Sequence, residues 1–164
     1  MIPSKLKLIV IGAGGHAKVA ISTFQAMGKT VDAVYDDDSS KWGSKILGVT
    51  VVAGTNQIPQ DQKIEGFIGI GNNTHRKALA QKLSLSWVSA IHPRAFIHET
   101  VEIGRGVLIC AGACVQPSSI LGAHSIINTH ATIDHDCRVG AFAHIGPGAN
   151  LCGNVHVDEG GFVG

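Results

Sequence analysis

The sequence predicts two structural units in 164 residues: a small α/β unit and then a triangular solenoid of parallel strands. Three observations predict this division. An aliphatic residue recurs at every sixth position of the second part, eleven glycines fall in the same stretch, and a buried strand near the start leads into a glycine-rich turn. We therefore place an α/β domain over residues 1–91 and an all-β domain over residues 92–164.

The repeat of six begins at Ile97. Because a period of six fits neither a helix nor a simple hairpin, it indicates a repeat architecture. One aliphatic residue per hexad then points to a shared interior, and three hexads make one coil that stacks on the next. The first residue of each hexad is Ile, Val or Leu without exception: Ile97, Ile103, Ile109, Val115, Leu121, Ile127, Ile133, Val139, Ile145, Leu151, Val157 and Val163.

The fifth residue of each hexad is small or slender, and we expect it to let the chain turn a tight corner. The many glycines argue against any long helix in this stretch. The fifth residues are Val101, Val107, Ala113, Ser119, Ser125, Ala131, Cys137, Ala143, Ala149, Val155 and Gly161.

The first part opens on a continuous apolar run, Leu6 to Ile11, which is typical of a central parallel strand. A turn with the sequence GAGGH follows at residues 12–16, and a helix is expected from about Ala17 to Met27. A second strand, Val31 to Tyr35, ends in three aspartates at 36–38. This strand, glycine turn, helix and strand form the layout of a nucleotide-binding half-domain.

The glycine turn is a candidate ligand site. Backbone N–H groups at a helix start attract anions, and glycines let a ligand come close. Asp36 and Asp37 are placed to accept hydrogen bonds from a ribose or a base. A plain tight turn and a solvated acidic turn remain the alternatives, since the dinucleotide fingerprint is incomplete: Ala17 stands at its sixth position.

Further strands complete the small sheet. We expect them near Val49 to Ala53, at Phe67 to Ile70 and at Trp87 to Ile91, with a helix from about Thr74 to Leu83. Gly71 follows the middle strand, where ligands of open α/β sheets bind. His92 and Pro93 mark the crossing into the solenoid.

The composition excludes several classes of protein. The formal net charge is +1 and there is no basic cluster, so nucleic acid is not an expected partner. No apolar run is long enough to span a membrane. The four cysteines form no CxxC pair and are expected to be small core residues, which fits a reducing cytoplasm. They are Cys110, Cys114, Cys137 and Cys152.

Taken together, the motifs resemble a known family. GAGGHA at 12–17, DDD at 36–38, IGNN at 70–73, HP at 92–93 and the hexad repeat are similar to the nucleotide-sugar acetyltransferases of the sialic-acid O-acetyltransferase and UDP-4-amino-sugar N-acetyltransferase type. The resemblance implies a Rossmann-like domain followed by a left-handed parallel β-helix. It also implies a homotrimer with its sites between subunits, acetyl-CoA bound by the β-helix, and no metal. The residues that it implies for the UDP-sugar are Gly14, Gly15, His16, Asp36, Asp37 and Gly71.

Six histidines fall in the repeat. We expect His98, His124 and His156 to be corner residues that face solvent. His135 differs because aspartates flank it in the sequence IDHDC. An imidazole with a pKa near neutrality can take a proton from an attacking amine, and a carboxylate can orient it.

A polar turn is the other reading of this aspartate–histidine–aspartate segment. The resemblance implies that His135 is the general base and Asp136 the acidic residue beside it. It further implies that His144 contacts acetyl-CoA; a buried or interfacial histidine is the other interpretation of this residue.

The expected function is transfer of acetyl from acetyl-CoA to the amino group of a bacillosamine-type UDP-4-amino-sugar, by direct attack. O-acetylation of a sugar or sialic acid is the first alternative, and a non-catalytic nucleotide-sugar-binding trimer is the second. A zinc enzyme is disfavoured, because His130 and His135 would supply only two ligands. The sequence ends at Gly164 in the middle of a hexad, where relatives of this type continue through further coils. We therefore expect either that the sequence is truncated there or that it binds CoA more weakly.

Overall fold

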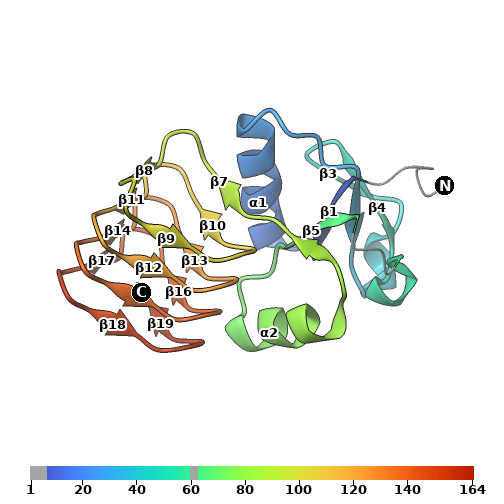
Figure 1. Cartoon of the computed structure of the whole chain (residues 1–164). Helices are drawn as coiled ribbons and strands as arrows, with labels where there is room; N and C mark the ends of the chain where they lie inside the picture. Colours follow the sequence, from blue (N-terminus) through green and yellow to red (C-terminus); the bar gives the residue numbers. More distant parts are fainter. Residues whose placement is uncertain (1–6, 60–62) are drawn as a thin grey trace.

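The computed structural model describes residues 7–59 and 63–164 and shows two units side by side (Figure 1). Leu6, where the first strand was expected to begin, lies outside these residues. The Rossmann-like unit and the parallel β-helix that the sequence predicts are both confirmed. No described helix has both the length and the apolar character needed to cross a bilayer.

The front unit is a six-stranded sheet in the order β3-β4-β2-β1-β5-β6. All pairs are parallel except β3 with β4. All four residues of β1 are buried, as expected of a strand covered on both faces. The strands are β1 (Leu8–Ile11), β2 (Ala33–Tyr35), β3 (Lys45–Ile46), β4 (Val49–Ala53), β5 (Glu65–Ile68) and β6 (Ser86–Trp87).

Two α-helices belong to this unit. Helix α1 (Gly15–Ala26) begins two residues before the expected start, so Gly15 and His16 lie in its first turn. Helix α2 (Asn73–Lys82) is capped by Asn72, whose side chain accepts a hydrogen bond from the backbone N–H of His75 at 2.9 Å. Short 3-10 turns lie at Ser39–Lys41 (η1) and Thr55–Gln57 (η2).

The second unit is a stack of two-residue strands on three faces of a prism. Successive strands on one face are 18 residues apart, so that Leu108 pairs with Ile126 and Ile126 with His144. We call the face that meets the front unit the docking sheet; it contains β7 (Ala90–Ile91), β10 (Leu108–Ile109), β13 (Ile126–Ile127), β16 (His144–Ile145) and β19 (Phe162–Val163).

The other two faces are the second and third sheets. The second sheet contains β8 (Phe96–Ile97), β11 (Cys114–Val115), β14 (Thr132–Ile133) and β17 (Asn150–Leu151). The third sheet contains β9 (Glu102–Ile103), β12 (Ile120–Leu121), β15 (Arg138–Val139) and β18 (His156–Val157).

The interior of the prism is built from the first and fifth hexad residues, which form one apolar cluster. The corner itself differs from the expectation. From the second hexad onward, the left-handed backbone that makes the corner falls on the fourth hexad residue, with φ between 55° and 69°, and the slender fifth residue packs toward the inside. The fourth residues are Gly106, Gly112, Ser118, His124, His130, Asp136, Phe142, Gly148, Asn154 and Gly160.

The strand expected at Trp87 to Ile91 is two strands. Ser86–Trp87 pairs with β5 in the front sheet, whereas Ala90–Ile91 pairs with β10 in the docking sheet. The solenoid therefore begins two residues before the boundary placed at residue 92. The expected cysteine core is also only half right: Cys110 and Cys137 are buried, Cys114 is half-buried and Cys152 is exposed.

Both helices join the two units. Helix α1 packs Ala17, Ala20 and Ile21 into one cluster with Leu108 and Ile126, whose side chains point outward from the docking sheet. Helix α2 lies at the height of the later coils, beside the corner that joins the third sheet to the docking sheet (Figure 1).

Candidate active site

A cavity of about 210 Å³ lies at the carboxyl ends of β1, β2 and β5. Strand order reverses between β1 and β5, and open α/β sheets bind ligands at such a switch point. Helix α2 closes one side of the cavity. The lining residues are Ile11, Gly12, Asp36, Asp37, Asp38, Thr55, Ile70, His75 and Leu79.

The glycine turn has one structural glycine and two open ones. Gly12 has φ +102°, and a Cβ there would lie 2.7 Å from Cγ1 of Ile70. A Cβ on Gly14 or Gly15 would meet nothing within 4 Å. Gly14 caps α1 without a side-chain hydrogen bond, so a ligand can reach the N–H groups of the first turn.

The two aspartates expected to bind a ribose or a base already have partners within the chain. Asp36 accepts hydrogen bonds from the backbone N–H groups of Ala13 at 2.6 Å and Asp38 at 2.9 Å. Asp37 accepts from the N–H and hydroxyl of Thr55, and the backbone hydrogen bond lowers the pKa of its carboxyl. Both carboxylates shape the cavity, and any bond to a ligand is additional to these contacts.

The junction between the units brings together His16, Gly71 and His144. The rings of His16 and His144 have centroids 5.7 Å apart, and Gly71 lies against the His16 ring. Nδ1 of His144 lies 3.4 Å from the carbonyl oxygen of Gly71. Burial lowers the pKa of His16 to about 4 and also lowers the pKa of His144, with further lowering from the charge of Arg76.

His144 also has partners within the solenoid. Its Nε2 lies 3.0 Å from Nδ2 of Asn128, and Phe162 packs edge-on against its ring. His144 is 8% exposed, whereas Phe162 is 66% exposed. The docking sheet thus carries a buried imidazole beside an uncovered aromatic ring.

His124 contradicts the expectation that it faces solvent. It is 2% exposed, stacked on Phe142 and in edge contact with Trp87 of the front unit. Neither ring nitrogen has a hydrogen-bond partner. Burial lowers its pKa to about 4, followed by the charges of Arg105 and Arg76. Docking of the front unit turns this corner residue into a core residue.

His135 and Asp136 lie at the corner between the second and third sheets. His135 Nδ1 lies 2.7 Å from Oδ2 of Asp136, and both side chains are about half exposed. The hydrogen bond to Asp136 raises the pKa of His135, and the charge of Asp134 adds to this. The ring lies against Gly153 of the next coil, where a Cβ would come within 2.7 Å of Cε1.

This corner adjoins a hollow on the second sheet. The hollow has a volume of about 230 Å³, and Asp134 connects it to the His135 corner. Its lining mixes polar and apolar side chains from three coils: Cys114, Gln116, Thr132, Ile133, Asp134 and Leu151.

Within one chain the predicted site residues form two groups. Gly14, Gly15, His16, Gly71 and His144 lie where the front unit meets the docking sheet. His135 and Asp136 lie on the corner of the prism opposite that sheet, because the second and third sheets both separate them from it. The chain alone does not bring the candidate base to the nucleotide cavity.

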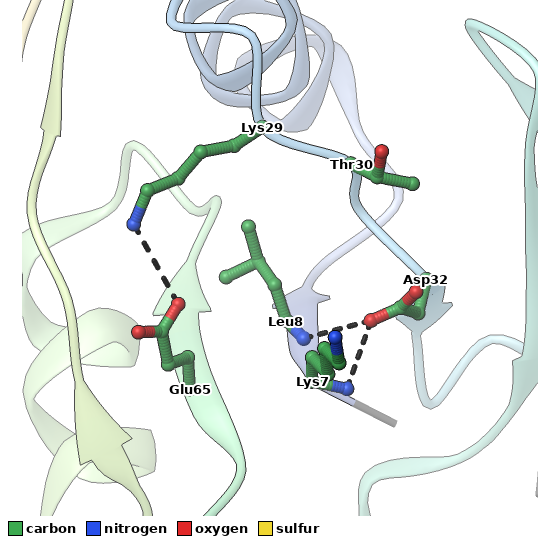
Figure 2. A pocket seen from close by; sticks show the side chains of 6 residues that line it. All are labelled: Lys7, Leu8, Lys29, Thr30, Asp32 and Glu65. Carbon is green, nitrogen blue, oxygen red and sulfur yellow. Dashed lines mark hydrogen bonds and ion pairs between the residues drawn. The ribbon is translucent and has the colours of Figure 1, made fainter. Parts of the chain in front are cut away.

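The remaining features do not add a competing site. Among residues 7–59 and 63–164, no three His, Cys, Asp or Glu side chains cluster as metal ligands. A depression of about 500 Å³ opens at the amino ends of the front strands (Figure 2). Lys29 lies 3.6 Å from Glu65 there, and Asp32 accepts from the backbone N–H groups of Lys7 and Leu8.

Sequence reasoning missed four residues near these groups: Gly12, Arg76, Asn128 and Gly153. Gly12 had a signal in its place directly after an apolar strand. Asn128 and Gly153 act through contacts between neighbouring coils, which the repeat places side by side. Arg76 acts through contacts with elements far apart in the chain, for which the local sequence carries no sign.

Comparison with known proteins gives consistent results. Residues 7–83 match the PglD N-terminal domain family. A curated relative, UDP-N-acetylbacillosamine N-acetyltransferase of Bacillus subtilis, is 36% identical over 108 residues, covering 62% of this chain and 50% of that protein.

Two solved structures match almost the whole chain. One is a histidine-to-asparagine mutant of perosamine N-acetyltransferase from Caulobacter crescentus in complex with CoA and GDP-perosamine. It is 40% identical, with a TM-score of 0.89, over 95% of this chain and 76% of that chain. The other is the acetyltransferase domain of PglB from Neisseria gonorrhoeae in complex with acetyl coenzyme A. It is 36% identical, with a TM-score of 0.86, over 98% of this chain and 80% of that chain. The chain belongs to the hexapeptide-repeat nucleotide-sugar N-acetyltransferase family.

Proposed function

We propose that this protein transfers an acetyl group from acetyl-CoA to the amino group of a nucleotide-linked amino sugar, with His135 as general base. The observation that carries the proposal is the 2.7 Å contact of His135 Nδ1 with Asp136 at an accessible corner. It leaves Nε2 of an exposed imidazole available, and the carboxylate stabilises the protonated ring.

The chemistry needs no covalent enzyme intermediate. His135 Nε2 takes a proton from the attacking amine while the amine nitrogen forms a bond to the thioester carbon. The carbon–sulfur bond of the tetrahedral intermediate then breaks, and the CoA sulfur leaves as the thiol after receiving that proton. Because the hydrogen bond to Asp136 raises the pKa of His135, the ring is a stronger base than an isolated imidazole.

The front cavity supplies the nucleotide site in this proposal. The open approach at Gly14 and Gly15 suits a diphosphate at the start of α1, and Asp36 and Asp37 line the space for the nucleoside. His16 and Gly71 then lie on the path from the diphosphate to the solenoid. Acetyl-CoA is proposed on the solenoid, with His144 as a contact.

Two sugar nucleotides are candidates. The sequence resemblance favours a bacillosamine-type UDP-4-amino-sugar, and the Bacillus subtilis relative is named for such a substrate. The Caulobacter enzyme, similar over 95% of this chain, was crystallised with GDP-perosamine. We give GDP-perosamine the first place in a screen because that similarity spans both units.

The test is a thiol-release assay with acetyl-CoA and each amino-sugar nucleotide, with mass spectrometry of the product. The expected product gains one acetyl group on nitrogen, and the matched hydroxy-sugar nucleotide gives no thiol release. Acetylation of the hydroxyl acceptor would favour the O-acetyltransferase alternative. Tight binding of the nucleotide sugar without thiol release would favour the non-catalytic one.

We further propose a homotrimer in which the His135 corner of one subunit meets the front unit of its neighbour. The separation of the two residue groups in one chain supports this, and closed rings are a common way to complete such sites. In a mixed-subunit experiment, His135→Ala chains are reassembled with Gly14→Asp chains. Each parent is expected to be inactive, and the mixture is expected to regain activity at mixed interfaces. A monomer in sedimentation, or no regained activity, would contradict the trimer.

Two glycine variants separate binding from folding in the front cavity. Gly14→Ala places its methyl group in open space, so it is expected to raise the KM for the sugar nucleotide without lowering the thermal midpoint. Gly12→Ala combines a left-handed φ with a clash against Ile70 and is expected to destabilise the fold.

A further inference from the structure

Among the described residues, Arg76 is the largest side chain that is fully buried, and it lies at the junction of the two units with 1% exposure. It projects from α2 and donates five hydrogen bonds: from Nε to the carbonyl oxygen of His124, from one terminal nitrogen to those of Ile70 and Gly71, and from the other to that of Phe142 and to Oδ1 of Asn73. An arginine has five N–H groups, so every donor is used.

None of these five acceptors is a carboxylate. A buried cation held only by neutral oxygens is costly, and a pair of apolar side chains would join the two units more cheaply. Burial lowers the pKa of Arg76 to about 10, and the guanidinium remains charged at neutral pH. Stability alone therefore does not account for an arginine at this position.

The carbonyl oxygen of Gly71 links Arg76 to His144. Arg76 donates to this oxygen at 3.1 Å, and Nδ1 of His144 faces it at 3.4 Å. The other side of the ring settles which nitrogen carries the proton. Oδ1 of Asn128 accepts from the backbone N–H of Thr129 at 2.8 Å, so its NH₂ group must be the part that faces His144 Nε2. Nε2 then accepts, and the proton is on Nδ1.

We infer that Arg76 is a positioning residue, which fixes the Gly71 carbonyl and through it holds His144 as the neutral Nδ1–H tautomer across the two units. The roles of Gly71 and His144 toward the sugar nucleotide and acetyl-CoA rest on the proposed function. With those roles, Arg76 sets the position of Gly71, on the sugar-binding unit, relative to His144, on the acyl-binding unit. Its charge also disfavours protonation of His16 and His144 and so lowers the pKa of each.

Nuclear magnetic resonance of the full chain with ¹⁵N-labelled histidine tests the tautomer directly. In the wild type, His144, assigned by its loss in His144→Gln, is expected to carry its proton on Nδ1 at neutral pH. In Arg76→Lys, which keeps a charge but has three donors on a single nitrogen, the Gly71 carbonyl is less firmly held. The preference of the His144 ring for the Nδ1–H tautomer is then expected to weaken, because Asn128 alone still favours it. A wild-type ring protonated on Nε2 would overturn the inference, even if no variant folds. So would an unchanged ring in a folded Arg76→Lys protein.

Lys77→Gln is the matched control. Lys77 is the next residue of α2 and pairs with Glu159 of the solenoid, so it also bridges the units but touches neither Gly71 nor His144. It is expected to leave the His144 tautomer unchanged. A loss of the single tautomer in Lys77→Gln would show that any loosening of α2 has the same effect, and would overturn the specific role of Arg76.

Kinetics add a second readout that separates this inference from the proposed function. Because misalignment of two bound substrates slows the chemical step, Arg76→Lys is expected to reduce kcat at least about 10-fold with a smaller change in either KM. Lys77→Gln is expected to keep kcat within about 2-fold. If the wild type acetylates no amino-sugar nucleotide while the tautomer shifts as described, the proposed function fails and the structural role of Arg76 stands. If the enzyme is active and Arg76→Lys changes neither kcat nor the tautomer, the inference fails alone.

Discussion

Two regions of the molecule give the histidine side chain opposite environments. At the corner between the second and third sheets, His135 is half exposed and a carboxylate raises its pKa. At the junction of the units, His16, His124 and His144 are largely covered, and burial lowers the pKa of each. His124, His135 and His144 all belong to the same repeating scaffold, so what covers a coil position, rather than its place in the repeat, determines the chemistry of the imidazole there.

This difference separates proton transfer from positioning. A ring that is accessible and supported by an anion can take up a proton and release it. A buried ring near an uncompensated arginine remains neutral and serves as a fixed hydrogen-bonding group. The four predictions that follow test this contrast, beginning with the largest effect.

Removal of the exposed ring is expected to have the greatest effect. His135→Ala should reduce kcat by roughly 10²–10⁴-fold, the range for loss of a general base. The thermal midpoint should change little, since the ring packs mainly against Gly153. Steady-state thiol release and thermal denaturation measure the two quantities. Wild-type activity in this variant would refute the base assignment.

Acid should weaken the fold through the buried rings. In the folded chain the pKa of His124 is about 4, against an ordinary value of 6.5, so the unfolded state binds protons first as the pH falls. The contribution of His124 to the free energy of unfolding should therefore be fully present above pH 6.5. It should fall by about 3 kcal/mol as the pH is lowered to 4. Urea unfolding across this pH range measures the decline. His124→Asn, which tolerates the left-handed corner, should give a shallower pH dependence, and an unchanged slope would contradict the burial argument.

The carboxylate beside the base should set the pH profile. Asparagine, like aspartate, tolerates the left-handed backbone of this corner, where φ is +60°. Asp136→Asn therefore keeps the corner but removes the carboxylate that raises the pKa of His135. The acidic limb of kcat/KM against pH should move to lower pH, because the ring loses its proton more readily. The plateau should fall by about 10-fold, because a weaker base transfers the proton less well. If the acidic limb of kcat/KM does not move in this variant, the ionisation that it reports belongs to a group other than His135.

Crowding the His135 ring, rather than removing it, should have the smallest effect on kcat. Gly153→Ala places a methyl group within 2.7 Å of His135 Cε1, and the exposed ring can swing away at little cost to folding. We expect kcat to fall by a few-fold, with an unchanged thermal midpoint. Cys152→Ala, one residue earlier and without contact to the ring, serves as the control and should behave as wild type. Equal kinetics for the two variants would mean that the ring is not held where the structure places it.

The repeat made most of the fold predictable. An aliphatic residue such as Ile109 or Ile127 must point inward wherever it occurs, so the period in the sequence reports the strands directly. The strand and glycine turn of the front unit were predictable for the same local reason. The turning residue of each corner was misplaced by one position, because a slender residue inside the prism and a left-handed residue at its corner are neighbours in sequence.

The junction was not predictable in this way. Nothing near His124 in the sequence shows that Trp87 will cover it, and nothing near Arg76 shows that its acceptors will be carbonyls of residues 124 and 142. These contacts depend on which corner of the prism meets α2, and the packing of the two whole units determines that corner. The same limit applies to the candidate site: His135 and Asp136 were predictable as a local pair, whereas the distance of that pair from the nucleotide cavity was not.

Helix α2 touches three successive coils at one corner, at the carbonyls of His124, Phe142 and Gly160. The spacing of those oxygens is set by the stacking of strands, and the spacing of Arg76 and Asn73 by the rise of a helix. Because both solenoid acceptors of Arg76 are backbone carbonyls one 18-residue coil apart, insertion of a segment shorter than one coil between residues 125 and 142 would move one of them away from Arg76. Homologues that differ in length within this interval should therefore differ by whole 18-residue coils, which present an equivalent carbonyl at the same corner.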